Sequence, residues 1–290
     1  MKSKIAFCID MGGTFLKGAI VNENHELLTP IYQVPAHSNQ PFKDYEKGLE
    51  EMFSLLEKER EKNHLSLSFI AFSCPGPFDY ASGVSYMKHK YQAIYQISLR
   101  AYIQERFNYT CPIYFENDVI SFLLGESSSL KHKEEKNICA ITLGTGLGYV
   151  LEKRGEIERN PLGSPLEVLY NRPYLDGIME DYFSGRGLVS FYEKISSKRV
   201  ASAYEVYVLA TQKDQDALTA LAVFGRELGK ALSPFFLENK VTDLFLGGQV
   251  SASSPFFLKY LKEELPNTNI HVTEDGTKGA IIGLAEKFFN

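Results

Sequence analysis

Two stretches of the sequence, 132 positions apart, share a pattern of an apolar strand, a glycine turn and a second strand. The first covers 4–21 and the second covers 137–151. The matched pairs are Ile9 with Ile141, Met11 with Leu143, and Gly12 with Gly144. Self-similarity at a long period predicts a duplicated domain, with chance as the alternative for so short a match.

The rest of the chain alternates between strand-like and helix-like segments. Further strands are expected at 69–74, 113–115, 242–246 and 270–272, and helices at 41–62, 99–107, 178–194, 203–211, 215–237, 255–264 and 278–289. Interleaved strands and helices predict an α/β fold. A length of 290 residues suggests about two domains.

Charge and cysteine usage limit the classes of partner and compartment. The formal net charge is −5, which argues against a protein that binds nucleic acid or anionic membranes through a basic surface. No window has the roughly 18 uncharged apolar residues of a membrane span, and an acid, Asp10, interrupts the first apolar run before it could serve as a signal peptide. The four cysteines, Cys8, Cys74, Cys111 and Cys139, form no C-x-x-C pair. Buried, reduced thiols in the cytoplasm are therefore expected.

Three glycine turns each follow an apolar strand. They are Gly12–Thr14, preceded by Asp10, then Gly144–Gly146, and Gly247–Gly248. Glycine lets the backbone approach a bulky anion, and successive N–H groups can hold phosphate oxygens. A single turn of this kind is more often only a tight β-turn, but three in one chain favour phosphate binding. The spacing fits neither the Walker P-loop nor the G-x-G-x-x-G dinucleotide motif.

Two acids at strand ends are candidates for chemistry. Asp118 follows a strand and precedes a helix, where an acid is most often an N-cap. Beside phosphate-binding turns, Asp118 is also a candidate base for a hydroxyl proton. Asp10 stands where a carboxylate could hold a magnesium ion over a polyphosphate, directly or through water.

The stretch Asp10–Lys17 reads Asp-x-Gly-Gly-Thr-x-x-Lys and resembles the opening of the ROK sugar kinases, in the actin/hexokinase-like ATPase superfamily. The other matching motifs are Pro75–Pro77 with Asp79 and Gly83, Glu116–Asp118, Leu143–Gly148, Glu180–Gly185, Gly247–Gly248 and Lys278–Ala280. These motifs follow one another in the family's order and span nearly the whole chain.

The resemblance implies a role for each matching residue. It implies a catalytic base at Asp118 and sugar contacts at Asn117, Asp118, Glu167, Tyr170 and Glu180, with Tyr170 where the family has a histidine. For Glu180, a helix N-terminal acid is the simpler interpretation, and both can hold. The implied contacts to ATP are Asp10, on the Mg2+ side, and Gly12, Gly13, Thr14, Lys17, Gly144, Thr145, Gly146, Gly247 and Gly248.

The implied fold has two duplicated actin/hexokinase-like (ribonuclease H-like) domains around a central cleft. Residues 1–116 would form the N-terminal α/β domain, with a C-terminal helix at about 279–290 packing back on it, and residues 117–278 the C-terminal α/β domain. A homodimer is also expected from the resemblance.

The sequence departs from the family in two respects. No cysteine follows Cys139, so the cysteine-rich zinc site of many members is not expected. The chain also lacks the N-terminal extension that carries the DNA-binding helices of ROK repressors, so no nucleic-acid partner is expected.

The implied function is ATP-dependent phosphorylation of a hexose hydroxyl, expected at C6 of glucose or a β-glucoside. Two alternatives remain open: a kinase for N-acetylmannosamine or another amino sugar, and a sugar-sensing regulatory protein without catalytic activity. The altered stretch around Glu167 and Tyr170 is the reason to keep both.

Overall fold

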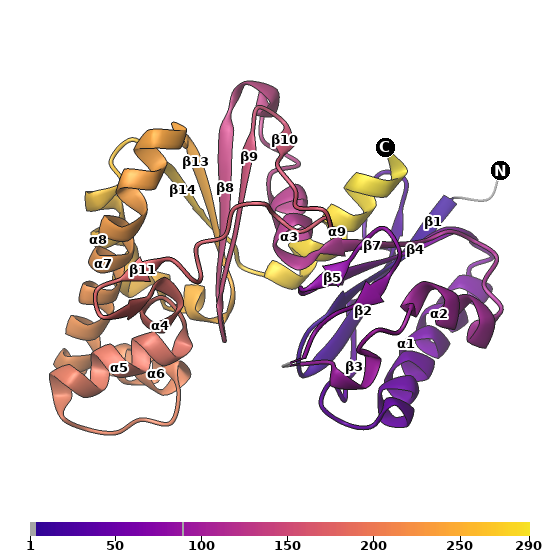
Figure 1. The fold of residues 1–290 in the computed structure, drawn as a ribbon, viewed down its shortest axis with the longest axis horizontal. Helices are drawn as coiled ribbons and strands as arrows, with labels where there is room; N and C mark the ends of the chain where they lie inside the picture. Colours follow the sequence, from indigo (N-terminus) through magenta and orange to yellow (C-terminus); the bar gives the residue numbers. More distant parts are fainter. Residues whose placement is uncertain (1–3, 89) are drawn as a thin grey trace. The chain divides into compact units, whose positions relative to one another are not determined.

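The computed structural model describes residues 4–88 and 90–290, and it confirms the α/β class. The chain divides into two compact units (Figure 1). The first comprises the chain up to Ser129 together with Arg159–Leu166 and Thr277–Asn290, and the second comprises Leu130–Glu158 and Glu167–Gly276. The border after Ser129 leaves the helix that begins at Asp118 in the first unit, whereas the sequence-based boundary at 116/117 lies just before that helix.

A five-stranded sheet forms the centre of the first unit. Its strands are β1 (Lys4–Met11), β2 (Phe15–Asn22), β3 (Tyr32–Pro35), β4 (Ser66–Cys74) and β7 (Ile113–Asn117). The order is β3-β2-β1-β4-β7, with β1 antiparallel to β2 and parallel to β4. The unit also contains β5 (Phe78–Asp79), β6 (Val84–Ser85), η1 (Gln92–Ile94), α1 (Phe42–Lys62), α2 (Leu99–Phe107), α3 (Asp118–Glu126) and nearly all of α9 (Gly276–Phe289).

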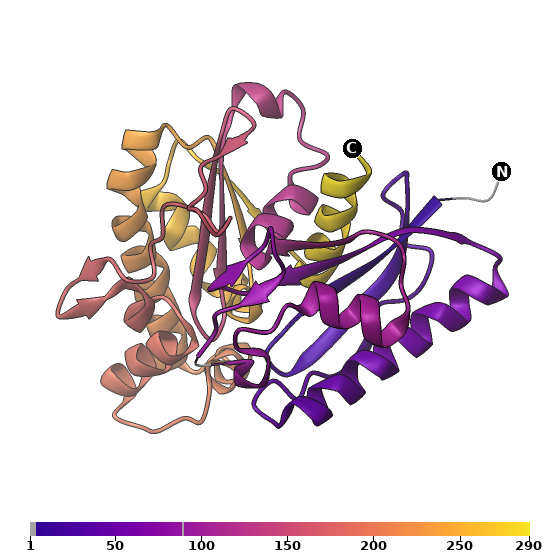
Figure 2. The same ribbon diagram turned by 45° about the vertical axis from the view of Figure 1, so that its right-hand side comes forward.

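Alternation along β1 places helices on both faces of this sheet. Ile5, Phe7 and Ile9 belong to a core shared with residues of α1 and α2. Ala6 and Cys8 point to the other face, in a core shared with α9. Successive side chains of a strand point to opposite faces, so the apolar run from Ile5 to Ile9 requires cover on both. Figures 1 and 2 show α9 and α1 on opposite sides of the sheet.

The second unit has a sheet of the same topology. Its strands are β8 (Asn137–Leu143), β9 (Leu147–Lys153), β10 (Glu156–Ile157), β13 (Asp243–Gly247) and β14 (Asn269–Val272), in the order β10-β9-β8-β13-β14. It also contains η2 (Lys133–Glu135), β11 (Pro173–Tyr174), β12 (Gly177–Ile178), α4 (Met179–Tyr182), α5 (Gly185–Ser196), α6 (Ala203–Thr211), α7 (Gln215–Asn239), η3 (Gln249–Ser253) and α8 (Ser254–Glu264).

Each sheet therefore places its strands in the spatial order third, second, first, fourth, fifth, which confirms the predicted duplication. The first two strands of each sheet form the antiparallel hairpin that carries a glycine turn. Pairing in the first hairpin closes at Met11 with Leu16 and in the second at Leu143 with Leu147. Three residues lie between Leu143 and Leu147 and four between Met11 and Leu16, so the second turn is one residue shorter.

The single helix expected at 178–194 is wrong. The structure has α4 and α5 with a break at Phe183 and Ser184. The backbone N–H of Gly185 donates to the carbonyl oxygen of Gly144 (2.8 Å), so it does not form the helical bond that would continue α4 into α5.

Cys8, Cys74 and Cys139 are buried and Cys111 is half-buried, each as a free thiol. Among the described residues, every helix is too short or too polar to cross a membrane.

Candidate active site

Asp118 lies at the first position of α3, directly after β7. The N-cap is Asn117, whose Oδ1 accepts hydrogen bonds from the N–H groups of Val119 (3.1 Å) and Ile120 (3.3 Å). The interpretation of Asp118 as the N-cap is therefore wrong. Because Asn117 satisfies the helix end, the carboxylate of Asp118 retains one local bond, from the N–H of Val119 (2.9 Å), and remains half-buried.

Asp10 and Asp118 lie at the same edge of the first sheet. Parallel pairing aligns Asp10 with Ser73 and Ser73 with Glu116, so the carboxyl ends of β1, β4 and β7 meet there. The hydroxyl of Ser73 donates to Oδ1 of Asp10 (2.9 Å).

Both carboxyl groups have raised pKa values. Burial raises the pKa of Asp10 to about 6, with a smaller contribution from the negative charge of Asp118, against the hydrogen bond from Ser73 and the charge of Lys17. Burial also raises the pKa of Asp118, although the positive charge of Lys90 and the Val119 N–H oppose it. A half-buried carboxyl group whose pKa is raised by burial and by a neighbouring acid, as at Asp10, is typical of functional sites.

Two side-chain hydroxyls bind the backbone carbonyl groups of the first glycine turn. The hydroxyl of Tyr91 donates to the carbonyl oxygen of Gly12 (2.5 Å), and that of Ser38 donates to the carbonyl oxygen of Gly13. A Cβ added at Gly13 would meet no described heavy atom within 4 Å, apart from its chain neighbours. Thr14 is exposed. The turn thus leaves open space on one side, as an anion would require.

Lys17 stands opposite Asp10 in the β1–β2 pairing. Its ammonium donates to the hydroxyl of Thr277, in the first turn of α9 (3.1 Å). Lys17 therefore supports the edge of the sheet that carries Asp10 and connects it to the last helix.

Sequence reasoning did not identify the buried cluster around Glu116. This side chain is 0% exposed, yet it accepts two hydrogen bonds from Arg159 (2.8 and 3.0 Å), one from Lys287, and one from the N–H of Asn117 (2.7 Å). A buried charge requires partners of this kind. Because Glu116 precedes Asn117 and Asp118, the cluster fixes the backbone on which the candidate base stands.

Tyr80 is a second residue that the sequence analysis missed. Its hydroxyl donates to the carbonyl oxygen of Cys74 (3.0 Å) and accepts from Nδ2 of Asn117 (3.0 Å). Its backbone N–H donates to the carbonyl oxygen of Leu162 (3.1 Å). Both the oxygen and the nitrogen of the Asn117 amide therefore have protein partners.

The second glycine turn packs against the start of α4 and α5. The N–H of Leu147 donates to Oε2 of Glu180 (3.0 Å). A Cβ on Gly146 would lie 2.5 Å from the same oxygen, so a side chain at this position would displace the carboxylate from the Leu147 N–H. Glu180 lies in the first turn of α4, as the helix-end interpretation predicts. Gly144 has open space where a Cβ would stand, and Thr145 is exposed.

The third turn lies against the second. Gly248 has a φ of 88°, and a Cβ there would lie 2.4 Å from the carbonyl oxygen of Leu143. Gly247 ends β13, which pairs with β8. The Gly144–Gly146 and Gly247–Gly248 turns therefore share one edge of the second sheet.

The remaining two candidates lie in the loop that leads to β11. Glu167 forms an ion pair with Arg172, and the side chain of Tyr170 is 43% exposed. The carbonyl oxygen of Tyr170 accepts from the N–H of Glu180 (3.0 Å). The structure thus brings Tyr170 and Glu180 together through their backbones, and it gives Glu167 a cationic partner that the sequence analysis did not anticipate.

The predicted site residues are divided between the two units. The first unit holds Asp10, Gly12, Gly13, Thr14, Lys17, Asn117 and Asp118. The second unit holds Gly144, Thr145, Gly146, Glu167, Tyr170, Glu180, Gly247 and Gly248.

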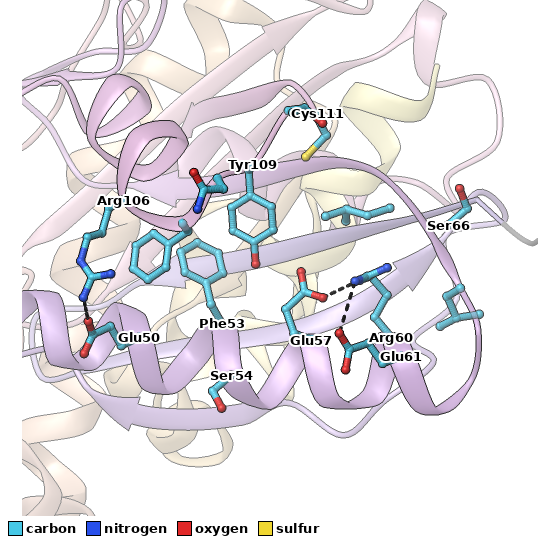
Figure 3. Close-up of a pocket in the computed structure, with 15 residues that line it drawn as sticks. Glu50, Phe53, Ser54, Glu57, Arg60, Glu61, Ser66, Arg106, Tyr109 and Cys111 are labelled. Carbon is cyan, nitrogen blue, oxygen red and sulfur yellow. Dashed lines mark hydrogen bonds and ion pairs between the residues drawn. The ribbon is translucent and has the colours of Figure 1, made fainter.

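A separate hollow of about 830 Å³ lies between α1 and the loop that joins α2 to β7 (Figure 3). Phe53 and Tyr109 line it, and the Glu57–Arg60 ion pair lies along α1 at its rim. No candidate site residue lines this hollow.

Comparison with known proteins identifies the family of this chain. The model of the ROK family matches residues 6–158, more than half of the chain. This chain belongs to the ROK family. A xylose repressor of Bacillus spizizenii is 22% identical over 274 residues, which cover 91% of this chain and 69% of the repressor. A beta-glucoside kinase of Klebsiella pneumoniae is 31% identical over 145 residues, covering 50% of this chain and 44% of the kinase.

Solved structures show the fold. A ROK family glucokinase from Streptomyces griseus, in complex with glucose and AMPPNP, matches with a TM-score of 0.78 and 17% identity, over 97% of this chain and 98% of the glucokinase. The fold of this chain is therefore the actin/hexokinase-like fold of the ROK sugar kinases, as expected.

The donor groups at the first sheet edge fit a magnesium ion. Carboxylate oxygens, with water, are the ligands that Mg2+ takes. Asp10 supplies such a group, half-buried at the strand end and held by Ser73.

Proposed function

We propose that this protein transfers the γ-phosphoryl group of ATP to a hydroxyl, at C6, of glucose or a β-glucoside. Membership of the ROK family supports a sugar kinase. The observation that carries the proposal is the environment of Asp118. Because Asn117 caps α3, Asp118 is left as a half-buried carboxylate with a raised pKa beside Asp10.

In this proposal Asp118 acts as the general base. The sugar oxygen bonds to the γ-phosphorus, the bond from that phosphorus to the β,γ-bridging oxygen breaks, and ADP leaves. The hydroxyl proton passes to the carboxylate of Asp118. A well-placed general base contributes about 10²- to 10⁴-fold in rate. The cluster of Glu116, Arg159 and Lys287 keeps Asp118 in place through the β7 backbone.

Phosphate binding is assigned to the glycine turns. Gly12–Thr14 and Gly144–Gly146 offer backbone N–H groups and exposed threonine hydroxyls to the phosphate oxygens, with Gly247–Gly248 toward the adenosine. Asp10 would hold magnesium, which neutralises phosphate charge when bound. Lys17 supports this edge through Thr277.

We assign the sugar contacts to Glu167, Tyr170 and Glu180. Asn117 contributes from the junction of β7 and α3, which it holds beside Asp118. The ion pair with Arg172 engages one oxygen of the Glu167 carboxylate and leaves the other for a sugar hydroxyl. A tyrosine with an exposed ring at position 170 offers a sugar an aromatic face and one hydroxyl. Such a surface suits the aglycone side of a glucoside, and for this reason we place β-glucosides beside glucose.

A regulatory protein that binds sugar without turnover is the second candidate. Similarity to a repressor over 91% of the chain, together with the changed stretch at Glu167 and Tyr170, favours it. A sensor, however, does not need a base such as Asp118.

Asp118→Asn tests the proposal. We expect sugar binding, measured by calorimetry, to stay near the wild-type value, and turnover to fall by at least about a hundredfold. Asp44→Asn, at a half-exposed acid of α1 that pairs with Lys47, is the matched control and should keep full turnover. Retained turnover in Asp118→Asn would remove this residue from the mechanism. Sugar binding without any turnover in the wild type would favour the sensor.

A further inference from the structure

Three aromatic side chains form a row on one side of α6. Tyr204 lies in the first turn of α6 and is 72% exposed. Its ring centroid is 6.0 Å from that of Tyr207, which lies 6.2 Å from the ring of Phe256 at the start of α8. The two inner rings are half-buried and support the outer one. The Tyr204 ring thus presents an aromatic face to solvent.

The row begins next to the candidate phosphate turn. Gly185, the first residue of α5, donates its N–H to the carbonyl oxygen of Gly144 (2.8 Å). A Cβ on Gly185 would lie 3.7 Å from Cβ of Ala203, the residue before Tyr204. The start of α6 therefore lies next to Gly185, which is itself hydrogen-bonded to the Gly144–Gly146 turn. Figure 1 shows α5 and α6 side by side near α4.

The other neighbour of this point is η3, which follows the third glycine turn. The same Cβ on Gly185 would lie 4.0 Å from Cγ2 of Val250. Tyr207, on the same side of α6 as Tyr204, contacts Phe256, which follows η3 in the chain. Helix α6, which carries the outer two rings of the row, thus packs against η3, the segment that follows Gly248.

From this arrangement we propose that the ring of Tyr204 is the stacking platform for the base of the nucleotide, and that it favours a purine over a pyrimidine. The inference rests on the proposed kinase function, because the nucleotide is anchored by its phosphates at the Gly144–Gly146 turn. A purine offers the larger π-face, and stacking between a base and an aromatic side chain needs no hydrogen-bond match.

The absence of tryptophan from the sequence provides a direct probe. Tyr204→Trp introduces a single tryptophan whose emission can be excited selectively. We expect magnesium AMPPNP to change this emission in a saturable way, and inorganic tripolyphosphate, which has no base, to leave it unchanged. Leu237→Trp is the control, because Leu237 is 69% exposed near the end of α7, just before β13 begins. Its emission should not respond to either ligand.

Kinetics supply the second measurement. Tyr204→Ala should raise the KM for ATP by roughly five- to hundredfold, the range that loss of a stacked base produces. The KM for UTP should change less, and the KM for sugar should stay unchanged. Tyr204→Phe keeps the π-face and should retain the wild-type KM for ATP.

Failure of this inference differs from failure of the kinase proposal. If AMPPNP stabilises the wild type against heat but Tyr204→Trp stays silent and Tyr204→Ala keeps its KM for ATP, the platform is wrong and the kinase proposal stands. If Tyr204→Ala instead changes only the oligomeric state in light scattering, with nucleotide binding intact, the exposed ring is a contact between copies and the platform is equally overturned. If no nucleotide binds the wild type, both proposals fall.

Discussion

The buried ion cluster at Glu116 provides the sharpest test of what holds the candidate base in place. Arg159→Met removes the guanidinium that donates two hydrogen bonds to Glu116, a side chain with 0% exposure. Removing one partner of a buried pair costs about 3–5 kcal/mol, because the other charge stays buried. Lys287 remains in contact with Glu116, so we expect the low end of this range, about 3 kcal/mol.

Urea denaturation followed by circular dichroism measures this loss of unfolding free energy. Arg106→Met is the matched control in the same unit: Arg106 is 48% exposed and pairs with Glu46 and Glu50. A surface pair of this kind is worth about 1 kcal/mol or less. The double variant Glu116→Gln with Arg159→Met should recover much of the loss, because no charge is left buried. A loss in Arg159→Met no greater than in Arg106→Met, or no recovery in the double variant, would refute the reasoning.

Three further perturbations have defined outcomes. Asn117→Ala removes the cap of α3 and should cost about 1 kcal/mol in urea denaturation. Gly146→Ala places a Cβ 2.5 Å from the carboxylate of Glu180. Because a displacement near 1 Å at a site can lower the rate about a hundredfold, steady-state kinetics should show kcat/KM reduced by about that factor. Burial raises the pKa of Asp243, but bonds from His271, Thr242 and Lys136 outweigh it and hold the pKa below its usual value. Asp243→Asn should therefore cost about 2 kcal/mol near neutral pH, and the difference from wild type should vanish in acid unfolding curves as the pH falls through the folded-state pKa; an unchanged difference would contradict this.

The fold was predictable because local patterns determine most of it. The offset between 9 and 141 identified two hairpins that the structure confirms as the first two strands of two sheets with the same topology. The helix at 99–107 agrees with α2 to the residue. The split between α4 and α5 was missed because a tertiary bond, from Gly185 to Gly144, overrides the helical pattern at that point.

The motif residues of the candidate site were visible for the same reason: each lies in a short local pattern of glycines and acids. The supporting residues were not. Arg159 reaches Glu116 from 43 positions away, Tyr80 reaches Asn117 from 37 and Lys287 reaches Glu116 from 171. A single sequence does not indicate such partners. An acid near the end of a largely apolar strand was the one available signal, because a buried acid demands a cation from elsewhere in the chain.

The N-cap of α3 shows a second limit of prediction from the sequence. Asn117 and Asp118 are adjacent, and both are good N-cap residues. The pairing of β7 with β4 extends through Cys74 and Asn117, and the helix begins one residue later. Strand register, and not propensity, therefore decides which of the two side chains is left for chemistry.

Sugar-dependent formation of ADP measures the central claim most directly. A coupled ADP assay with magnesium ATP should be run over glucose, β-glucosides and N-acetylated amino sugars, with the phosphorylated product identified by mass spectrometry. The account predicts turnover with glucose or a β-glucoside, one sugar phosphate per ADP, and no such turnover in Asp118→Asn. ADP release that ignores every sugar, or sugars that bind without any phosphorylated product, would contradict it.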